Sequence, residues 1–226
     1  MILAATGLQR ERRILEGPGV TAIAGGGDAD RLERTLEQQI HRARGLASIG
    51  IGGGLAPGLK VGDWAVADTV LARDMRWQTD EAWSARLVDR LGGRRGAMLG
   101  SDAIVATAAD KARLHAATGA LAVDMESHVV ARVAARHGLP FVALRVISDP
   151  AERGLPPAAL VGMAPDGGPA LGAVLRSLIS RPGQLPALLR LARDAERAFG
   201  SLLRGRGRLG PGLGFPDFGE LALDVP

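Results

Sequence analysis

The alternation of short apolar segments with amphipathic ones is the feature that most restricts the fold of this chain. Asp28 is predicted to cap a helix that runs to about Arg44, and residues 127–137 predict a helix that Gly138 and Pro140 end. Six apolar, partly β-branched segments predict strands: Ile2–Ala5, Val20–Ala24, Leu46–Ile51, Trp64–Leu71, Leu121–Val123 and Phe141–Ile147. Strands and helices in alternation indicate a layered α/β domain with a largely parallel central sheet. Ligands of such sheets bind at the carboxyl ends of the strands.

The composition changes after about residue 155. Residues 155–170, "LPPAALVGMAPDGGPA", predict a long loop, and residues 171–180 predict a helix. From residue 185 to 204, leucines recur at helical spacing against arginines, which predicts a basic amphipathic helix. This helix would either pack on the body or on a partner subunit, or lie on a membrane surface. The following "GRGRLGPGLGFPDFGE" is expected to be flexible or loosely attached.

The composition excludes several classes of function. Lysine and arginine number 28 against 24 acidic residues, a net charge of +4 that is typical of an ordinary solvated surface rather than a nucleic-acid-binding one. Aromatic residues are 3% and tyrosine is absent, so a base-stacking platform is not expected. The absence of cysteine excludes disulfides and thiolate metal sites and fits a reducing cytoplasm. The four histidines show no metal-ligand spacing, and no cofactor, signal peptide or membrane span is expected.

A glycine cluster follows the third predicted strand, in "SIGIGGGLAPGLKVGD". Glycines at the end of a buried strand let a ligand approach the backbone, where free N–H groups can hold an oxyanion. The spacing does not fit a dinucleotide fingerprint, because the third glycine would fall on Leu55. Tight turns without a ligand explain the cluster equally well.

Acidic residues end two further strands. One strand leads into Asp124, Met125 and Glu126, and about twenty residues later another ends in Ser148 and Asp149. Both ends are expected at the same edge of the sheet, where one carboxylate could accept hydrogen bonds from a diol and another could donate a proton. The structural alternative is that Glu126 only stabilises a helix N-terminus and that Asp149 only caps a turn.

Taken together, these stretches resemble the nucleoside phosphorylase family, which includes purine and uridine phosphorylases and the methylthioadenosine/S-adenosylhomocysteine nucleosidases. The segments "GGGLAPGLKVGD", "SDAIV", "VDMES" and "LRVISD" occur in the family's order. The resemblance implies a three-layer α/β/α fold around a mixed, partly barrel-like sheet, a homo-oligomer, and a catalytic domain over residues 1–180. Residues 181–226 would then form a separate amphipathic helix and a tail rich in glycine and proline.

The resemblance also implies roles for individual residues. Asp149 would be the general acid that protonates the purine N7, and Glu126 would bind the ribose hydroxyls. The remaining substrate-binding residues would be Met125 under the sugar, Ile104 and Val105 near the base, and Ser148 beside the acid. An aromatic residue often stands where this chain has Ile104, so base stacking is expected to be looser.

The position after the first strand decides the reaction type that the resemblance implies. Hydrolytic nucleosidases carry a glutamate there that activates water, and phosphorylases carry an arginine that binds phosphate. An ungapped alignment places Arg10 at that position, which favours phosphorolysis. Glu11 is one residue further along and would be the base of a hydrolase if the alignment were shifted by one residue. The implied phosphate site comprises Thr6, Gly7, Arg10, Ser48 and Gly50, with inorganic phosphate as co-substrate. Because phosphorylases often have an arginine at Ser48 and a hydroxyl at Ile51, another arginine such as Arg44 would have to compensate.

A narrower resemblance links the chain to the hopanoid-associated phosphorylases. It rests on "TGLQRERRILEGPGV", "AGGGDADRLE", "SDPAERGLPPAALVGM" and "RPGQLPALLRLARDA". It implies release of adenine from adenosylhopane to leave phosphoribosylhopane, in a cytoplasmic enzyme that contacts the inner membrane face through the helix of residues 185–204. The alternatives are a hydrolytic purine nucleosidase and, from another class, a non-catalytic nucleoside- or lipid-binding module.

Overall fold

A computed structural model describes residues 1–160 and 171–216 of the chain. Its strands belong to one mixed sheet. They are β1 (Ile2–Thr6), β2 (Val20–Ala24), β3 (Gly45–Gly54), β4 (Trp64–Ala72), β5 (Met75–Gln78), β6 (Arg94–Gly100), β7 (Ala122–Asp124) and β8 (Phe141–Asp149). The six predicted strands are therefore present, with ends that differ by at most a few residues.

The sheet closes partly on itself. The strands follow the order β2-β1-β3-β7-β6-β4-β5, and β8 pairs with both β3 and β4. The ladder β3–β7–β6–β4–β8 thus returns to β3, which forms a small barrel with β1 and β2 as an open extension. The pairs β3–β7, β4–β5 and β4–β8 are antiparallel and the others are parallel, so the sheet is more mixed than a largely parallel one.

The helices are mostly short. They are α1 (Gln9–Leu15), α2 (Ala29–Gln39), α3 (Glu81–Leu91), α4 (Ala108–Thr118), α5 (Ser127–His137), α6 (Pro157–Leu160), α7 (Leu171–Ser180) and α8 (Leu185–Leu209), with 3₁₀ turns at Ile40–Arg42, Pro182–Gln184 and Pro211–Gly214. Asp28 accepts a hydrogen bond from the amide of Arg31 and so caps α2, as predicted. This helix was predicted to reach about Arg44, but α2 ends at Gln39 and a 3₁₀ turn follows it to Arg42.

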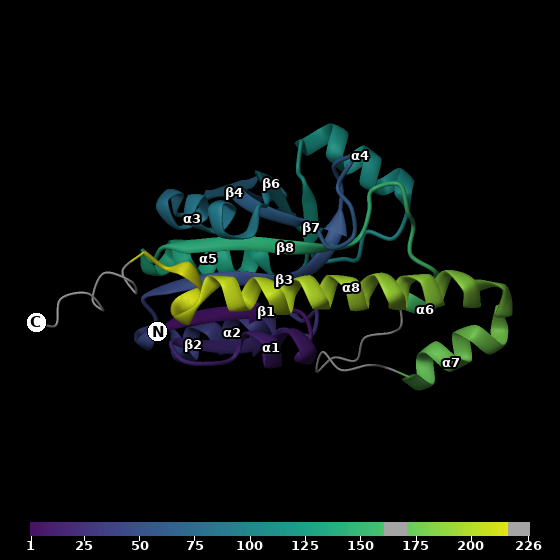
Figure 1. The fold of residues 1–226 in the computed structure, drawn as a ribbon, viewed down its shortest axis with the longest axis horizontal. Coiled ribbons are helices and arrows are strands. Elements are labelled where there is room, and N and C mark those ends of the chain that lie inside the picture. Colours follow the sequence, from purple (N-terminus) through teal and green to yellow (C-terminus); the bar gives the residue numbers. More distant parts are fainter. Residues whose placement is uncertain (161–170, 217–226) are drawn as a thin grey trace, which may run out of the picture.

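Successive strand residues point to opposite faces of the sheet, and each face has its own helical layer. Ile2 and Ala4 of β1 pack with residues of α1, α3 and α8, whereas Leu3 and Ala5 pack with residues of α2 and α5. The long helix α8 runs across the body in front of the sheet (Figure 1). The helices α2 and α5 belong to the other core cluster, on the opposite face of the sheet. The three-layer α/β/α fold with a partly barrel-like sheet is therefore confirmed.

The C-terminal segment is integrated into the body. Ala198, Phe199 and Leu202 of α8 are buried in the same core cluster as β8. Trp83 of α3 donates its indole N–H to the carbonyl of Leu213 at 2.9 Å and meets the ring of Phe215 edge-on at 4.9 Å. Residues 205–216 are therefore packed against the body. The expectation that they are loosely attached is wrong, because the side chains of Leu213 and Phe215 are buried there. The last ten residues of the chain lie outside the described ones, as do residues 161–170 of the predicted loop.

The N-terminal part of α8 and the adjoining α7 extend beyond the sheet (Figure 1). Leu175, Ile179, Leu185 and Leu189 are exposed on these two helices. Across residues 1–160 and 171–216, no helix combines the length and apolarity needed to cross a bilayer.

Candidate active site

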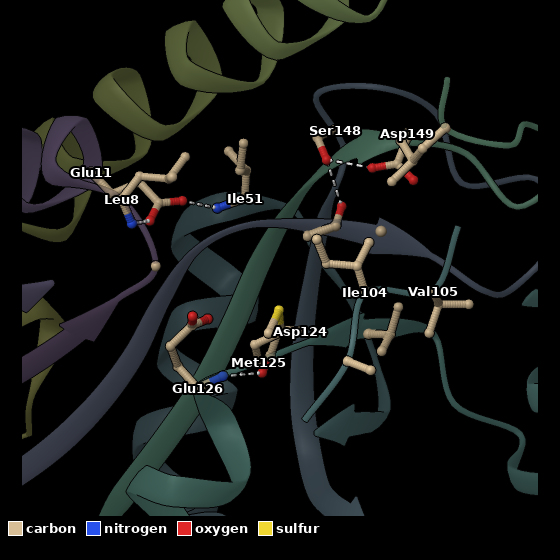
Figure 2. A pocket seen from close by; sticks show the side chains of 16 residues that line it. Leu8, Glu11, Ile51, Ile104, Val105, Asp124, Met125, Glu126, Ser148 and Asp149 are labelled. Atoms are coloured by element: carbon tan, nitrogen blue, oxygen red, sulfur yellow. Dashed lines mark hydrogen bonds between the residues drawn. The ribbon is translucent and has the colours of Figure 1, made fainter. Parts of the chain in front are cut away.

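A cavity of about 230 Å³ opens at the carboxyl ends of β1, β7 and β8 and beside the second half of β3. The glycines of β3 form part of its wall, as the glycine cluster predicted. Its walls are Gly7, Leu8, Glu11, Ile51, Gly52, Gly53, Ala103, Ile104, Val105, Val123, Asp124, Met125, Glu126, Ser148, Asp149 and Leu155 (Figure 2). Seven predicted site residues line it: Gly7, Ile104, Val105, Met125, Glu126, Ser148 and Asp149.

Glu11 places a buried carboxylate in this cavity. It stands in the first turn of α1, where Oε2 accepts a hydrogen bond from the amide of Leu8 at 2.7 Å. Oε1 accepts another from the amide of Ile51 on β3, also at 2.7 Å (Figure 2). Burial raises the pKa of Glu11, against the lowering effect of these amides and of Arg145. A carboxylate with a raised pKa is a stronger base, and two backbone amides hold this one in place.

Gly50 makes room for that carboxylate. A Cβ at residue 50 would lie 2.6 Å from Oε1 of Glu11, closer than real side chains approach one another. The glycine at this position therefore belongs to the site, although it does not line the cavity and its role is to admit a glutamate.

Glu126 stands on the opposite side of the cavity from Ile104 and Val105, with its carboxylate directed toward the interior (Figure 2). Its Oε2 lies 3.3 Å from Nη2 of Arg145, a fully buried guanidinium that also reaches Oδ2 of Asp124 at 3.2 Å and the Ser48 hydroxyl at 2.8 Å. The side chain of Glu126 makes no hydrogen bond to the N-terminus of α5. Asp124 makes that cap instead, accepting from the amides of Glu126 and Ser127. Glu126 is therefore left to face the cavity.

The guanidinium of Arg145 pairs with the carboxylates of Asp124 and Glu126, and its charge also acts on Glu11. Burial, with the charges of Asp124 and Glu11 adding to it and that of Arg145 opposing it, raises the pKa of Glu126 from 4.5 to about 7. The neutral form of Glu126 is thus favoured in the fold relative to the unfolded chain.

We expect the free energy of unfolding to fall between pH 5 and pH 8. A carboxyl whose pKa is raised on folding contributes its full stability below 4.5 and loses it as pH rises through about 7. The loss is on the order of 3 kcal/mol at 1.4 kcal/mol per pKa unit, and Glu11 acts in the same direction. Urea unfolding at pH 5 and pH 8 measures it. Glu126→Gln, which stays neutral at both, is expected to show a clearly smaller loss, and an equal loss in both proteins would contradict the assignment.

Asp149 lies at the end of β8, across the cavity from Glu11 (Figure 2). Its Oδ1 is 2.6 Å from the hydroxyl of Ser148, and its Oδ2 pairs with the ammonium of Lys111. The carboxyl is buried at the edge of the cavity with both oxygens engaged, which fixes its orientation toward a bound ligand.

Arg10 does not reach the cavity. Its guanidinium forms a two-pronged ion pair with Glu196 of α8 and lies 4.2 Å from the centroid of the Phe199 ring. The side chain is about half exposed, on the outer side of α1. The placement of Arg10 therefore does not support the expectation that it binds phosphate in the site. One step along a helix turns a side chain by about 100°, so Glu11 faces the cavity and Arg10 faces α8.

The other expected phosphate ligands also lie elsewhere. Thr6 is fully buried, and its hydroxyl is within hydrogen-bond distance of the carbonyls of Leu8 and Ile23. Ser48 is fully buried against Arg145. Arg44 precedes the amino end of β3, 5.8 Å from the Phe215 ring and at the opposite end of the strand from the cavity. Of the expected set, only Gly7 lines the cavity.

Glu11 was the alternative base in the sequence analysis, and it is the residue that lines the cavity. No role was predicted from the sequence for two other charged residues of the site, Arg145 within "LRVISD" and Lys111, one of only two lysines in the chain. In the described ranges 1–160 and 171–216, no cluster of three or more histidine, aspartate and glutamate side chains is placed to hold a metal ion.

Comparisons of sequence show what this chain is similar to. The family model described as "Phosphorylase superfamily" matches residues 16–180. The chain is 32% identical over 172 residues to the futalosine hydrolase of Streptomyces coelicolor, covering 67% of this chain and 69% of that protein. It is 27% identical over 175 residues to the 5'-methylthioadenosine/S-adenosylhomocysteine nucleosidase of Mycobacterium bovis, covering 58% and 69%.

Solved structures are similar in fold. An S-adenosylhomocysteine nucleosidase from Streptococcus pyogenes superposes with a TM-score of 0.66 at 17% identity, covering 93% of this chain and 97% of that one. The futalosine hydrolase of Helicobacter pylori superposes with a TM-score of 0.62 at 17% identity, covering 91% and 96%. Because the family model matches well over half of the residues, the chain belongs to the phosphorylase superfamily, whose members include enzymes that cleave N-glycosidic bonds.

Proposed function

We propose that the protein is a hydrolytic purine nucleosidase, which cleaves the N-glycosidic bond of an adenine nucleoside with water. The observation that carries this proposal is the carboxylate of Glu11 in the wall of the cavity, at the position where Arg10 was expected. Among the described residues, neither an arginine nor a lysine lines that cavity.

Electrostatics favours water over phosphate as the nucleophile. The carboxyl groups of Glu11, Asp124, Glu126 and Asp149 all line the cavity, and a phosphate dianion entering it would be repelled by those that are ionised. A neutral water molecule meets no such barrier, and an ionised carboxylate can accept its proton. The phosphorolysis inferred from Arg10 is therefore replaced by hydrolysis.

The residues divide the reaction between them. Glu126 accepts hydrogen bonds from the ribose hydroxyls and stabilises the sugar as it becomes an oxocarbenium ion. Asp149 gives its proton to N7 of the base while the electron pair of the C1′–N9 bond passes to the base. Glu11 takes a proton from the water whose oxygen bonds to C1′. Positioning of water, sugar and base in one cavity supplies much of the remaining rate.

The relatives support the hydrolytic reading. One relative is named as a hydrolase of futalosine, and the others are named as nucleosidases of methylthioadenosine or S-adenosylhomocysteine. The names of the nucleosidases support an adenine nucleoside as the substrate. The apolar wall formed by Leu8, Ile51, Ile104 and Leu155 would receive the parts of such a substrate that carry no charge.

The test of this function is release of free base by the purified protein. Incubation with 5′-methylthioadenosine, S-adenosylhomocysteine and futalosine, followed by chromatography of the products, is expected to show base released from at least one of them. The Asp149→Asn variant serves as the background control. No base release above that control from any of the three would contradict the proposal and favour the non-catalytic binding module.

A lipid-linked nucleoside such as adenosylhopane stays a prediction, as does a homo-oligomer. We propose that α7 and α8 bring the enzyme to an anionic membrane surface. Leu175 and Ile179, spaced by one helical turn, and Leu185 and Leu189, spaced likewise, are exposed there. Arg176, Arg181, Arg190 and Arg193 lie among them, and no acidic residue occurs between residues 171 and 193. Exposed apolar side chains among arginines are typical of helices that lie in the headgroup region.

Vesicle flotation tests this contact. The chain is expected to float with vesicles that contain one-third phosphatidylglycerol and to remain unbound with pure phosphatidylcholine. Leu185→Glu/Leu189→Glu is expected to abolish flotation without loss of base release from a water-soluble nucleoside. The contact would be excluded if the unmodified chain and the Leu185→Glu/Leu189→Glu variant floated equally, or if the unmodified chain did not float with the anionic vesicles.

A further inference from the structure

Lys111 is a buried cation directly behind the cavity. It is one of two lysines among 28 basic residues, and its side chain has no exposed surface. Burying an ammonium group is costly unless it is paired and hydrogen-bonded. Contacts with a carboxylate and with backbone carbonyls offset this cost for Lys111.

The ammonium of Lys111 binds one short segment of chain. It donates to Oδ2 of Asp149, to the carbonyl of Pro150 at 3.0 Å and to the carbonyl of Arg153 at 2.9 Å. An ammonium has three donors, so these contacts use all of them. A residue of α4 thereby holds both the carboxyl of Asp149 and the turn that follows it.

The second oxygen of Asp149 has a different environment. Its Oδ1 is 2.6 Å from the hydroxyl of Ser148, which also lies 3.1 Å from the carbonyl of Gly52. The hydroxyl has one proton. It is therefore shared between the carbonyl of Gly52 and Oδ1, whereas Oδ2 is held by the ammonium of Lys111. Oδ1 is thus the oxygen of Asp149 that Lys111 does not occupy.

We propose that Lys111 is a positioning residue for leaving-group protonation, acting through Asp149. This inference rests on the proposed function, in which Asp149 is the general acid. As the proton passes from Oδ1 to N7 of the base and the C1′–N9 electron pair moves into the base, Asp149 becomes a carboxylate. The fixed ammonium at Oδ2 offsets that new negative charge and keeps the carboxyl oriented.

The leaving group separates this role from simple structural support. An adenine nucleoside needs a proton on its base, whereas 4-nitrophenyl β-D-riboside releases 4-nitrophenolate, which leaves without one. Lys111→Met is expected to lower kcat for the adenine nucleoside by about 10²-fold and to change kcat for the riboside by less than about threefold. Lys60→Met, at the other and exposed lysine, is the matched control and should leave both unchanged. Equal losses on the two substrates would overturn the proposal.

A double variant keeps the test decisive where Lys111→Met unfolds because a buried carboxylate is left unpaired. Lys111→Met/Asp149→Asn removes both charges, and its kcat for the adenine nucleoside is expected to match that of Asp149→Asn alone. A further tenfold loss would mean that Lys111 acts independently of Asp149, and would overturn the proposal. An Asp149→Asn variant with normal kcat would instead contradict the proposed function, so the two failures can be told apart.

Discussion

Replacing Glu11 by glutamine is expected to lower kcat for base release by about 10³-fold or more, because the amide cannot take a proton from water. Glutamine has nearly the same shape, but it offers one acceptor to the two amides of Leu8 and Ile51 that the carboxylate now satisfies. A modest loss of stability, about 1 to 3 kcal/mol, should accompany the change. The measurements are steady-state kinetics and thermal unfolding on the same preparation.

The neighbouring residue supplies the matched control. Arg10→Ala removes the ion pair with Glu196 on the outer surface and is expected to leave kcat within about threefold, since surface ion pairs contribute little. The opposite pattern, in which Arg10→Ala is inactive and Glu11→Gln is not, would restore Arg10 as the residue that determines the nucleophile.

Replacing Asp149 by asparagine is expected to lower kcat for an adenine nucleoside by about 10²- to 10⁴-fold, the usual range for loss of a general acid. Asparagine keeps an oxygen for Lys111 but has no acidic proton for the base. KM is expected to change much less, because the site otherwise stays assembled. Asp63→Asn, at an exposed aspartate away from the cavity, is the control with the same change of charge. Near-normal base release by Asp149→Asn would remove the general acid from the mechanism.

The strands and helices with clean periodicity were predictable from the sequence. Residues 127–137 form α5 as predicted, because one apolar face recurs at helical spacing and Gly138 adopts the left-handed conformation that ends the helix. β6 was missed, since it begins with two arginines at an exposed end and lacks an apolar run. α1 was missed as well, because its seven residues carry four charges and only Leu15 and Glu11 are buried.

The missed helix explains the error at the site. Because α1 was not predicted, the sequence did not show which of the residues after β1 face the cavity. An ungapped alignment then placed Arg10 at the position that Glu11 occupies in the structure. Glu126 and Asp149 were predictable because each lies at the end of a buried strand, Asp149 as the last residue of β8 and Glu126 two residues after β7. Lys111 could not be predicted, because its contact with Asp149 joins residues 38 apart through the packing of α4.

The identity of the nucleophile tests the central claim most directly. Purified enzyme is incubated with a nucleoside that it cleaves, in phosphate-free buffer and in 50 mM phosphate, and the sugar product is identified by mass spectrometry. Hydrolysis with Glu11 as the base predicts equal rates of base release in both buffers and only the free sugar as product. Dependence of the rate on phosphate, with a sugar 1-phosphate as the product, would contradict it.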